Sequence, residues 1–198
     1  TKNRFSFNSC FTSFATKYGE SYIAAYTIAI NLWFLGAFII DGYSSAGNIL
    51  SGKLFGAKDY NSLIKLSNKL IIYGIVIGFI LAIIGGVLYY PIGTLFTKDP
   101  EVLAEFYNVF WLILAMQPIC AIAFIFDGMF KGLGKMKTLR NVLLFSTFIV
   151  FVPILFWLDS LEYKLYAIFI ALTFWMIARG LPLIIKFRKL FLPLSQNN

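Results

Sequence analysis

The stretch FIIDGYSSAGNILSGKLFGAKD, residues 38–59, places a carboxylate and several small or polar residues at the end of an apolar segment. In a helix, one face carries Asp41 and the polar residues at i+3, i+4 and i+7, which are Ser44, Ser45 and Asn48. Asp41 precedes Lys53 by 12 residues, which is about 18 Å of helix. If Lys53 marks the watery end, Asp41 lies near the middle of a roughly 30 Å hydrocarbon core. A carboxylate at that depth is costly, so the stretch predicts a functional polar face within a membrane.

The composition of the whole chain is typical of an integral membrane protein. Of its 198 residues, 60% are hydrophobic and 13% are charged, and the mean hydropathy is +0.80. Soluble domains carry about 25% charged residues. The net charge of +8 would suit nucleic acid, but the basic residues lie in short runs between apolar segments of spanning length. We therefore expect the lipid bilayer as a partner of this chain, and no nucleic acid.

The chain contains one short and five full-length apolar segments. Residues 5–16 offer only 12 residues between the charges of Arg4 and Lys17, about 18 Å of helix where roughly 20 residues are needed to cross. They predict a partial span, approximately 5–18, which is the end of a longer helix. The expected full spans are 21–56, 68–97, 102–131, 139–158 and 163–188. The fold class is therefore all-α, a polytopic transmembrane bundle that forms a single domain over residues 1–198.

Prolines and glycines predict where these helices bend or come close together. Pro118 at the centre of its segment predicts a kink, because proline lacks a backbone donor and clashes one turn back. Gly85, Gly86 and Pro91 interrupt the segment 68–97 toward its far end. Three glycine pairs at i, i+4 spacing predict close helix contacts. They are Gly52 and Gly56, Gly74 and Gly78, and Gly128 and Gly132.

The charges of the connections predict the orientation of the chain. One set of alternate connections holds eleven basic residues: Lys53, Lys58, Lys65, Lys69, Lys131, Lys135, Lys137, Arg140, Lys186, Arg188 and Lys189. The other set holds three: Lys17, Lys98 and Lys164. Because cytoplasmic loops carry the excess of Lys and Arg, the first set is expected in the cytoplasm, together with the C-terminus. The sequence thus predicts a multi-pass protein of the cell (inner or cytoplasmic) membrane.

Three separated motifs resemble one transporter family. They are DGYSSAGNILSGKLFGAKD at 41–59, GTLFTKDPEV at 93–102 and QPICAIAFIFDGMFKGLGKMK at 117–137. In this order and helix spacing they are similar to the second half of a multidrug and toxic compound extrusion (MATE) transporter, in its DinF-like branch. The resemblance covers about residues 10–185. It implies a twelve-helix protein of two six-helix lobes, in which this chain supplies helices seven to twelve.

The resemblance also implies a function and partners. It implies secondary active antiport, in which amphiphilic or cationic small molecules are exported while Na+ or H+ enters. The partners would be the missing N-terminal six-helix lobe and a small amphiphilic substrate, with the coupling ion and no other cofactor. Two departures from the family pattern are the short first segment and the absence of the N-terminal lobe. They keep open the alternative of a non-transporting membrane fragment or an interaction subunit from a split or truncated gene.

Eight polar residues are candidates for lining a transport cavity or coupling ions: Asp41, Ser44, Ser45, Asn48, Asn31, Gln117, Asp127 and Arg179. Asp41 has the structural alternative of burial against a neighbouring hydroxyl or amide, and Asn31 is rotated from it by about 80° on the helix. Gln117 would alternatively satisfy backbone groups freed by the proline kink. Asp127 has Lys131 at i+4 as a local partner, or Arg179 across helices. Arg179 would otherwise snorkel to the cytoplasmic interface.

Enzymatic chemistry is not expected from this sequence. The chain has no His, no carboxylates paired at close helical spacing in the middle of an apolar segment, and no recognisable Ser/Lys motif. We therefore expect neither an intramembrane enzyme nor a metal site. The tryptophans are too scattered along the chain to predict an aromatic binding cage, and they lie at positions 33, 111, 157 and 175.

Overall fold

A computed structural model describes residues 19–196, and within that range the chain forms helices and no strand. The expected partial span at 5–18 lies outside the described residues. The helices are α2 (Glu20–Gly56), α3 (Tyr60–Val87), α4 (Tyr89–Phe96), α5 (Pro100–Gly132), α6 (Met136–Phe145), the π-helix η1 (Ser146–Phe151), α7 (Val152–Ser160) and α8 (Lys164–Gln196). Because α6, η1 and α7 follow one another without a break, residues 136–160 form one rod.

Five spans within residues 19–196 are long and apolar enough to cross a membrane. They are α2, α3, α5, the rod from α6 to α7, and α8. Every full span expected from the sequence has its counterpart here. The all-α fold class is confirmed, and the chain is a multi-pass membrane protein.

The ends of two helices differ from the predicted boundaries. α3 begins at Tyr60, well before the expected 68, because Asp59 caps it by accepting a hydrogen bond from the Ser62 backbone N–H at 2.9 Å. The hydrogen bonds from Ser62 also lower the pKa of Asp59, which keeps a negative charge at the helix N-terminus. α8 continues past the expected 188 because Phe187 and Phe191 are buried there and their rings pack together.

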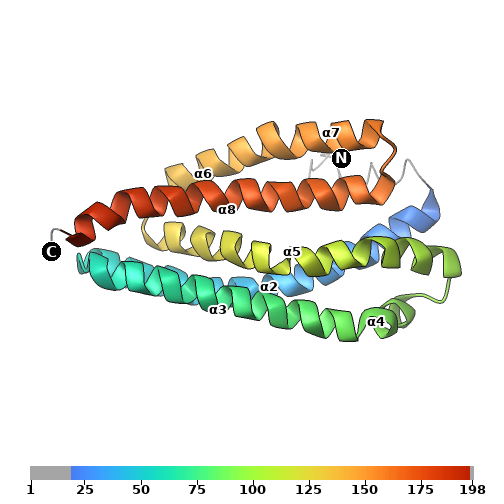
Figure 1. Cartoon of the computed structure of the whole chain (residues 1–198), viewed down its shortest axis with the longest axis horizontal. Helices are drawn as coiled ribbons and strands as arrows, with labels where there is room; N and C mark the ends of the chain where they lie inside the picture. Colours follow the sequence, from blue (N-terminus) through green and yellow to red (C-terminus); the bar gives the residue numbers. More distant parts are fainter. Residues whose placement is uncertain (1–18, 197–198) are drawn as a thin grey trace, which may run out of the picture.

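α5 is the central helix of the bundle. It contacts α2, α3 and α8 along its length, and the rod from α6 to α7 packs mainly on α8. Figure 1 shows this rod as the outermost layer beside α8, with α3 along the opposite side of the molecule. The side chains of α5 fill much of the core, as Phe106, Ile113 and Phe130 are fully buried. Any site between the helices is therefore formed by α5 together with the helices that pack against it.

The predicted interruption of the segment 68–97 falls close to its expected place, and the kink expected at Pro118 stays a prediction. The helix that starts as α3 ends at Val87 and resumes as α4 at Tyr89, between the Gly85–Gly86 pair and Pro91. Pro118 lies inside α5, and a Cβ added at Gly78 would be 2.6 Å from its Cα. α3 thus approaches the proline closely, as a small residue permits. The wide turn of η1 just before Pro153 is not predicted by the sequence pattern.

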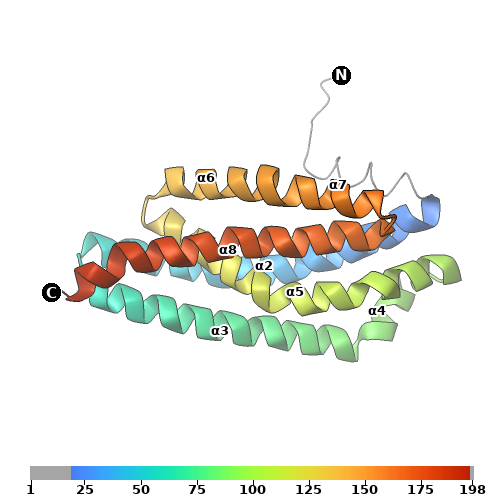
Figure 2. The ribbon, with the colours of Figure 1, turned by 45° about the horizontal axis from the view of Figure 1, so that its top comes forward.

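Connections with many and few basic residues lie at opposite ends of the bundle. Figure 2 shows the connections α2–α3 and α5–α6 at the same end as the C-terminal end of α8. The connections α4–α5 and α7–α8 lie at the other end. Connections rich in basic residues therefore alternate with poor ones along the chain, as the sequence predicts. The cytoplasmic location of the basic end stays a prediction.

Candidate functional site

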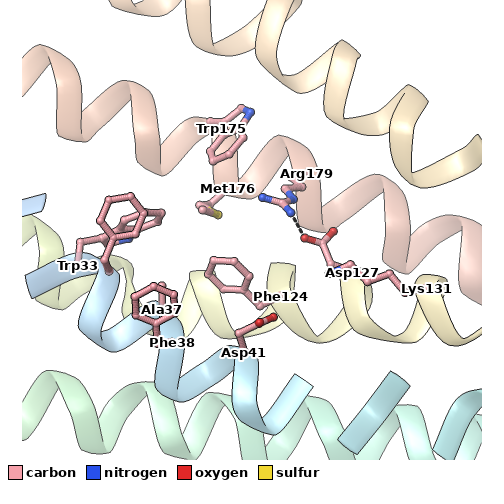
Figure 3. Close-up of a pocket in the computed structure, with 11 residues that line it drawn as sticks. Trp33, Ala37, Phe38, Asp41, Phe124, Asp127, Lys131, Trp175, Met176 and Arg179 are labelled. Carbon is pink, nitrogen blue, oxygen red and sulfur yellow. Dashed lines mark ion pairs between the residues drawn. The ribbon is translucent and has the colours of Figure 1, made fainter. Parts of the chain in front are cut away.

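A cavity of about 300 Å³ lies between α2, α5 and α8. Figure 3 shows its lining, with Trp33 toward the left and Asp127 and Lys131 toward the right. The lining residues are Trp33, Phe34, Ala37, Phe38, Asp41, Phe124, Asp127, Lys131, Trp175, Met176 and Arg179. Two carboxylates and two cationic side chains thus meet aromatic rings in one space.

Helical periodicity explains how these side chains reach the same cavity. On α2, positions 34, 37, 38 and 41 follow the i, i+3, i+4 and i+7 pattern, so they form one stripe. On α5, Phe124, Asp127 and Lys131 repeat at i, i+3 and i+7. On α8, Arg179 follows Trp175 by one turn. Each helix therefore presents a single face to the cavity.

Asp127 and Arg179 form an ion pair that joins α5 to α8. The Asp127 side chain is 2% exposed and the Arg179 side chain 14%. The guanidinium also lies over two rings, 5.7 Å from the centre of Phe124 and 5.2 Å from that of Trp175. These contacts stabilise a cation inside an apolar bundle. Of the alternatives left open by the sequence, the structure has the pair across helices, whereas the Lys131 side chain is exposed.

Asp41 stands in a different environment from Asp127. It is exposed to the cavity, and no cation among residues 19–196 forms an ion pair with it. Since Arg179 neutralises Asp127, the carboxylate of Asp41 is the one left to act on a molecule in the cavity. A carboxylate beside aromatic rings attracts cations, and the rings bind flat apolar groups.

Four of the predicted residues on α2 do not line this cavity. Ser44 is buried and donates a hydrogen bond to the Phe124 carbonyl at 2.6 Å, while Ser45 donates to the Asp41 carbonyl at 2.9 Å. Asn48 is half-buried, and Asn31 is exposed and donates to the Thr27 carbonyl at 2.8 Å. The polar stripe is split because α5 packs directly over its Ser44 side. A transport role for these four residues stays a prediction that their positions do not support.

Gln117 lies in a second cavity, away from Asp41. This cavity of about 190 Å³ is lined almost entirely by apolar residues of α2, α3, α4 and α5. Gln117 is 4% exposed, and its Oε1 has no hydrogen-bond partner among the described residues. Its amide lies against Gly36, where an added Cβ would be 2.9 Å from Nε2. Gln117 and Asp41 therefore line different cavities, and a substrate contact for Gln117 stays a prediction.

The aromatic walls of the first cavity were not expected from the sequence. Trp33 and Trp175 are far apart in the chain, yet both line it. A signal was present: an aromatic residue stands one helical turn before three of the four charged residues that line the cavity. These pairs are Phe38 with Asp41, Phe124 with Asp127, and Trp175 with Arg179. Single tryptophans looked scattered because only the tertiary fold brings the three helices together.

Comparisons with known proteins agree with this architecture. The MatE family matches residues 5–157. Protein DETOXIFICATION 45, chloroplastic, from Arabidopsis thaliana is 33% identical over 123 residues, which are 62% of this chain and 22% of that protein. Protein DETOXIFICATION 42 from the same plant is 32% identical over 120 residues, or 61% of this chain and 23% of that protein.

Solved structures share the fold at low sequence identity. The Vibrio cholerae MATE transporter VcmN in its bent form has a TM-score of 0.83 at 17% identity, covering 96% of this chain and 43% of that chain. An outward-facing multidrug resistance MATE family transporter of the MOP superfamily gives 0.81 at 16% identity, covering 94% and 42%. This chain thus matches less than half the length of these transporters. With the family match, the motifs and the five-span bundle together, the chain belongs to the MatE family.

Proposed function

We propose that this chain forms one lobe of an antiporter that exports amphiphilic or cationic small molecules in exchange for Na+ or H+. The observation that carries the proposal is the cavity between α2, α5 and α8, where Asp41 faces aromatic rings. Ligand sites of small molecules are typically about 300–1,000 Å³ and mostly apolar, with a few polar groups that fix orientation. The volume of about 300 Å³ and the lining of this cavity fit one wall of such a site.

The charges of the cavity favour a cationic ligand. Asp127 is already neutralised by Arg179, so binding a cation there would require breaking a buried ion pair. Asp41 carries no such partner among the described residues, and Trp33, Phe34 and Phe38 lie on the same helix face. A flat cation would place its charge at Asp41 and its apolar surface on these rings.

Coupling follows from competition for the same carboxylate. A proton or Na+ neutralises Asp41, and a cationic substrate does so as well. Only one of them occupies the carboxylate at a time, so entry of the ion displaces the substrate. This exchange is the requirement for antiport through a single site.

A second lobe completes the proposed transporter. The chain covers 43% of the VcmN structure, and Asp41 lies on an exposed face of α2 that cannot contact lipid at low cost. A second six-helix lobe would cover that face and supply the other wall of the cavity. The motif resemblance supports placing this chain as helices seven to twelve of a DinF-like protein. If the chain is instead a non-transporting subunit, the cavity residues contribute nothing to efflux.

The proposal is tested by replacing Asp41 with asparagine. Asp41→Asn keeps the size and hydrogen bonding of the side chain but fixes its neutral state. We expect ion-driven efflux of ethidium from proteoliposomes, by a two-lobe transporter that contains this chain, to fall by about tenfold or more, the effect of losing one charge contact. Glu162→Gln, the corresponding exchange of an acid for its amide in the α7–α8 connection, should leave efflux unchanged. Normal efflux by Asp41→Asn, with an unchanged pH dependence, would make Asp41 a structural residue.

A further inference from the structure

A groove at the basic end of the bundle is separate from the transport cavity. It has a volume of about 160 Å³ and lies between the beginning of α3 and the end of α8. Figure 2 shows both of these segments at the end where the chain reaches its C-terminus. The lining residues are Ile64, Ser67 and Asn68 from α3, with Phe187, Arg188 and Leu192 from α8.

The charge around the groove is strongly positive. Five exposed basic residues lie on the two segments: Lys65, Lys69, Lys186, Arg188 and Lys189. The acidic residue of these segments is Asp59, whose carboxylate accepts a hydrogen bond at the N-terminus of α3. An anion in the groove would therefore meet a field of several positive charges.

The polar groups of the groove leave two donors available to an anion. The Ser67 hydroxyl already donates to the Ile64 carbonyl at 2.8 Å. Arg188 and Asn68 are both exposed, and they line the groove from opposite helices. A guanidinium binds phosphate through two parallel hydrogen bonds, and an amide N–H adds a third.

An exposed apolar strip continues from the groove toward the middle of the bundle. Ile72 follows Asn68 by one turn on α3, while Ile185 and Leu181 precede Arg188 by one and two turns on α8. Their exposed fractions are 60%, 52% and 53%. Side chains in these positions would contact acyl chains in a bilayer. A ligand that fits both parts has an anionic head and apolar chains.

We propose that this groove binds the headgroup of an anionic phospholipid. Arg188 and Asn68 hold the phosphate, and the acyl chains lie on the strip formed by Ile72, Ile185 and Leu181. Basic pockets between transmembrane helices are suited to such headgroups. The bound lipid bridges α3 and α8 on the outside of their contact at this end, where the rings of Tyr60 and Phe191 already pack together, so it stabilises the bundle.

Lipid retention by the purified chain tests this proposal. We expect native mass spectrometry to detect phosphatidylglycerol bound to the whole chain in detergent, and added phosphatidylglycerol to raise the melting temperature. Phosphatidylcholine should do neither. Arg188→Gln should weaken phosphatidylglycerol binding by about tenfold, since it removes a charged hydrogen-bond pair.

The matched control is Arg140→Gln, the same exchange on α6 at the same end of the bundle. Arg140 is exposed and does not line the groove, so its replacement should leave lipid binding unchanged. If both variants lose phosphatidylglycerol equally, the attraction comes from the general basic belt and the proposal is wrong. If inorganic phosphate alone raises the melting temperature as much as the lipid does, the groove is a small-anion site instead. Neither readout depends on transport or on Asp41.

Discussion

At the scale of single residues, the buried ion pair between Asp127 and Arg179 makes each side chain depend on the other. Removing one partner of a buried pair leaves an unpaired charge and costs about 3–5 kcal/mol. We therefore expect Asp127→Ala or Arg179→Ala alone to lower the melting temperature in detergent more than the double replacement does. The measurement is a thermal unfolding curve for each variant and for the double variant.

Lys131→Ala is the control for this pair. Lys131 is exposed at the edge of the same cavity, so its loss should change stability by no more than about 0.5 kcal/mol. Additive losses from Asp127→Ala and Arg179→Ala would contradict the pairing. They would mean that each charge is satisfied by its own surroundings.

The residue scale is also where prediction from sequence succeeds least. Of the eight polar residues predicted from the sequence, Asp41, Asp127 and Arg179 line one cavity and the other five do not. Helical periodicity could not separate Asp41 from Ser44, because it gives the direction of a side chain and not the helix that packs over it. The Ser44 hydroxyl donates to a carbonyl of α5, so it does not face the cavity. Tertiary packing, which a single sequence does not encode locally, makes that distinction.

At the scale of helices, α2 and α5 are held by a very close contact. Gly128 on α5 has room only for its hydrogen, since an added Cβ would lie 2.5 Å from the Ser44 carbonyl oxygen. Gly128→Ala would push the helices apart and cost about 1–3 kcal/mol, as overpacking typically does. We expect a lower melting temperature and a smaller ethidium efflux rate, because the same two helices line the cavity.

Gly42→Ala on α2 is the matched control, because an added Cβ there meets nothing within 4 Å. Alanine is also the better helix former, so this variant should be neutral or more stable by about 0.5–1 kcal/mol. Equal melting temperatures for the two variants would show that the helices are not in the close contact described. Gly132 repeats the arrangement one turn further along α5, against the backbone of Asn48.

Helices were predicted more completely than side-chain contacts. An apolar segment that crosses a bilayer must satisfy its own backbone groups, so hydropathy alone indicates a helix for each of the five spans. Charges were poorer markers of helix ends. α3 runs through Lys65 and Lys69 because capping by Asp59, and not the charge boundary, determines its first turn. Gly56 was predicted to pack like the other glycines, yet an added Cβ there meets nothing within 4 Å.

At the scale of the whole molecule, the separation of charge between the two ends predicts how the bundle sits in the membrane. Among the described residues, eleven basic residues belong to one end, whereas Lys98 and Lys164 belong to the other. The excess of Lys and Arg in short loops sets orientation, so the end with the C-terminus should be cytoplasmic. The helix bounds give the sites for reporters: residues 58 and 134 lie in connections at the basic end, and residues 98 and 162 lie in connections at the other.

A reporter that is active only in the cytoplasm should work after Lys58, after Gly134 or at the C-terminus, and should fail after Lys98 or Glu162. Alkaline phosphatase, which is active only outside the cytoplasm, should give the reverse pattern at the same five positions. Agreement between the two reporters excludes fusions that merely fail to fold. The opposite pattern would place the groove of Arg188 and Asn68 in the outer leaflet and the charge-rich end of the Asp41 cavity away from the cytoplasm. The fold and both sites would keep the same residues, because neither was inferred from the orientation of the chain.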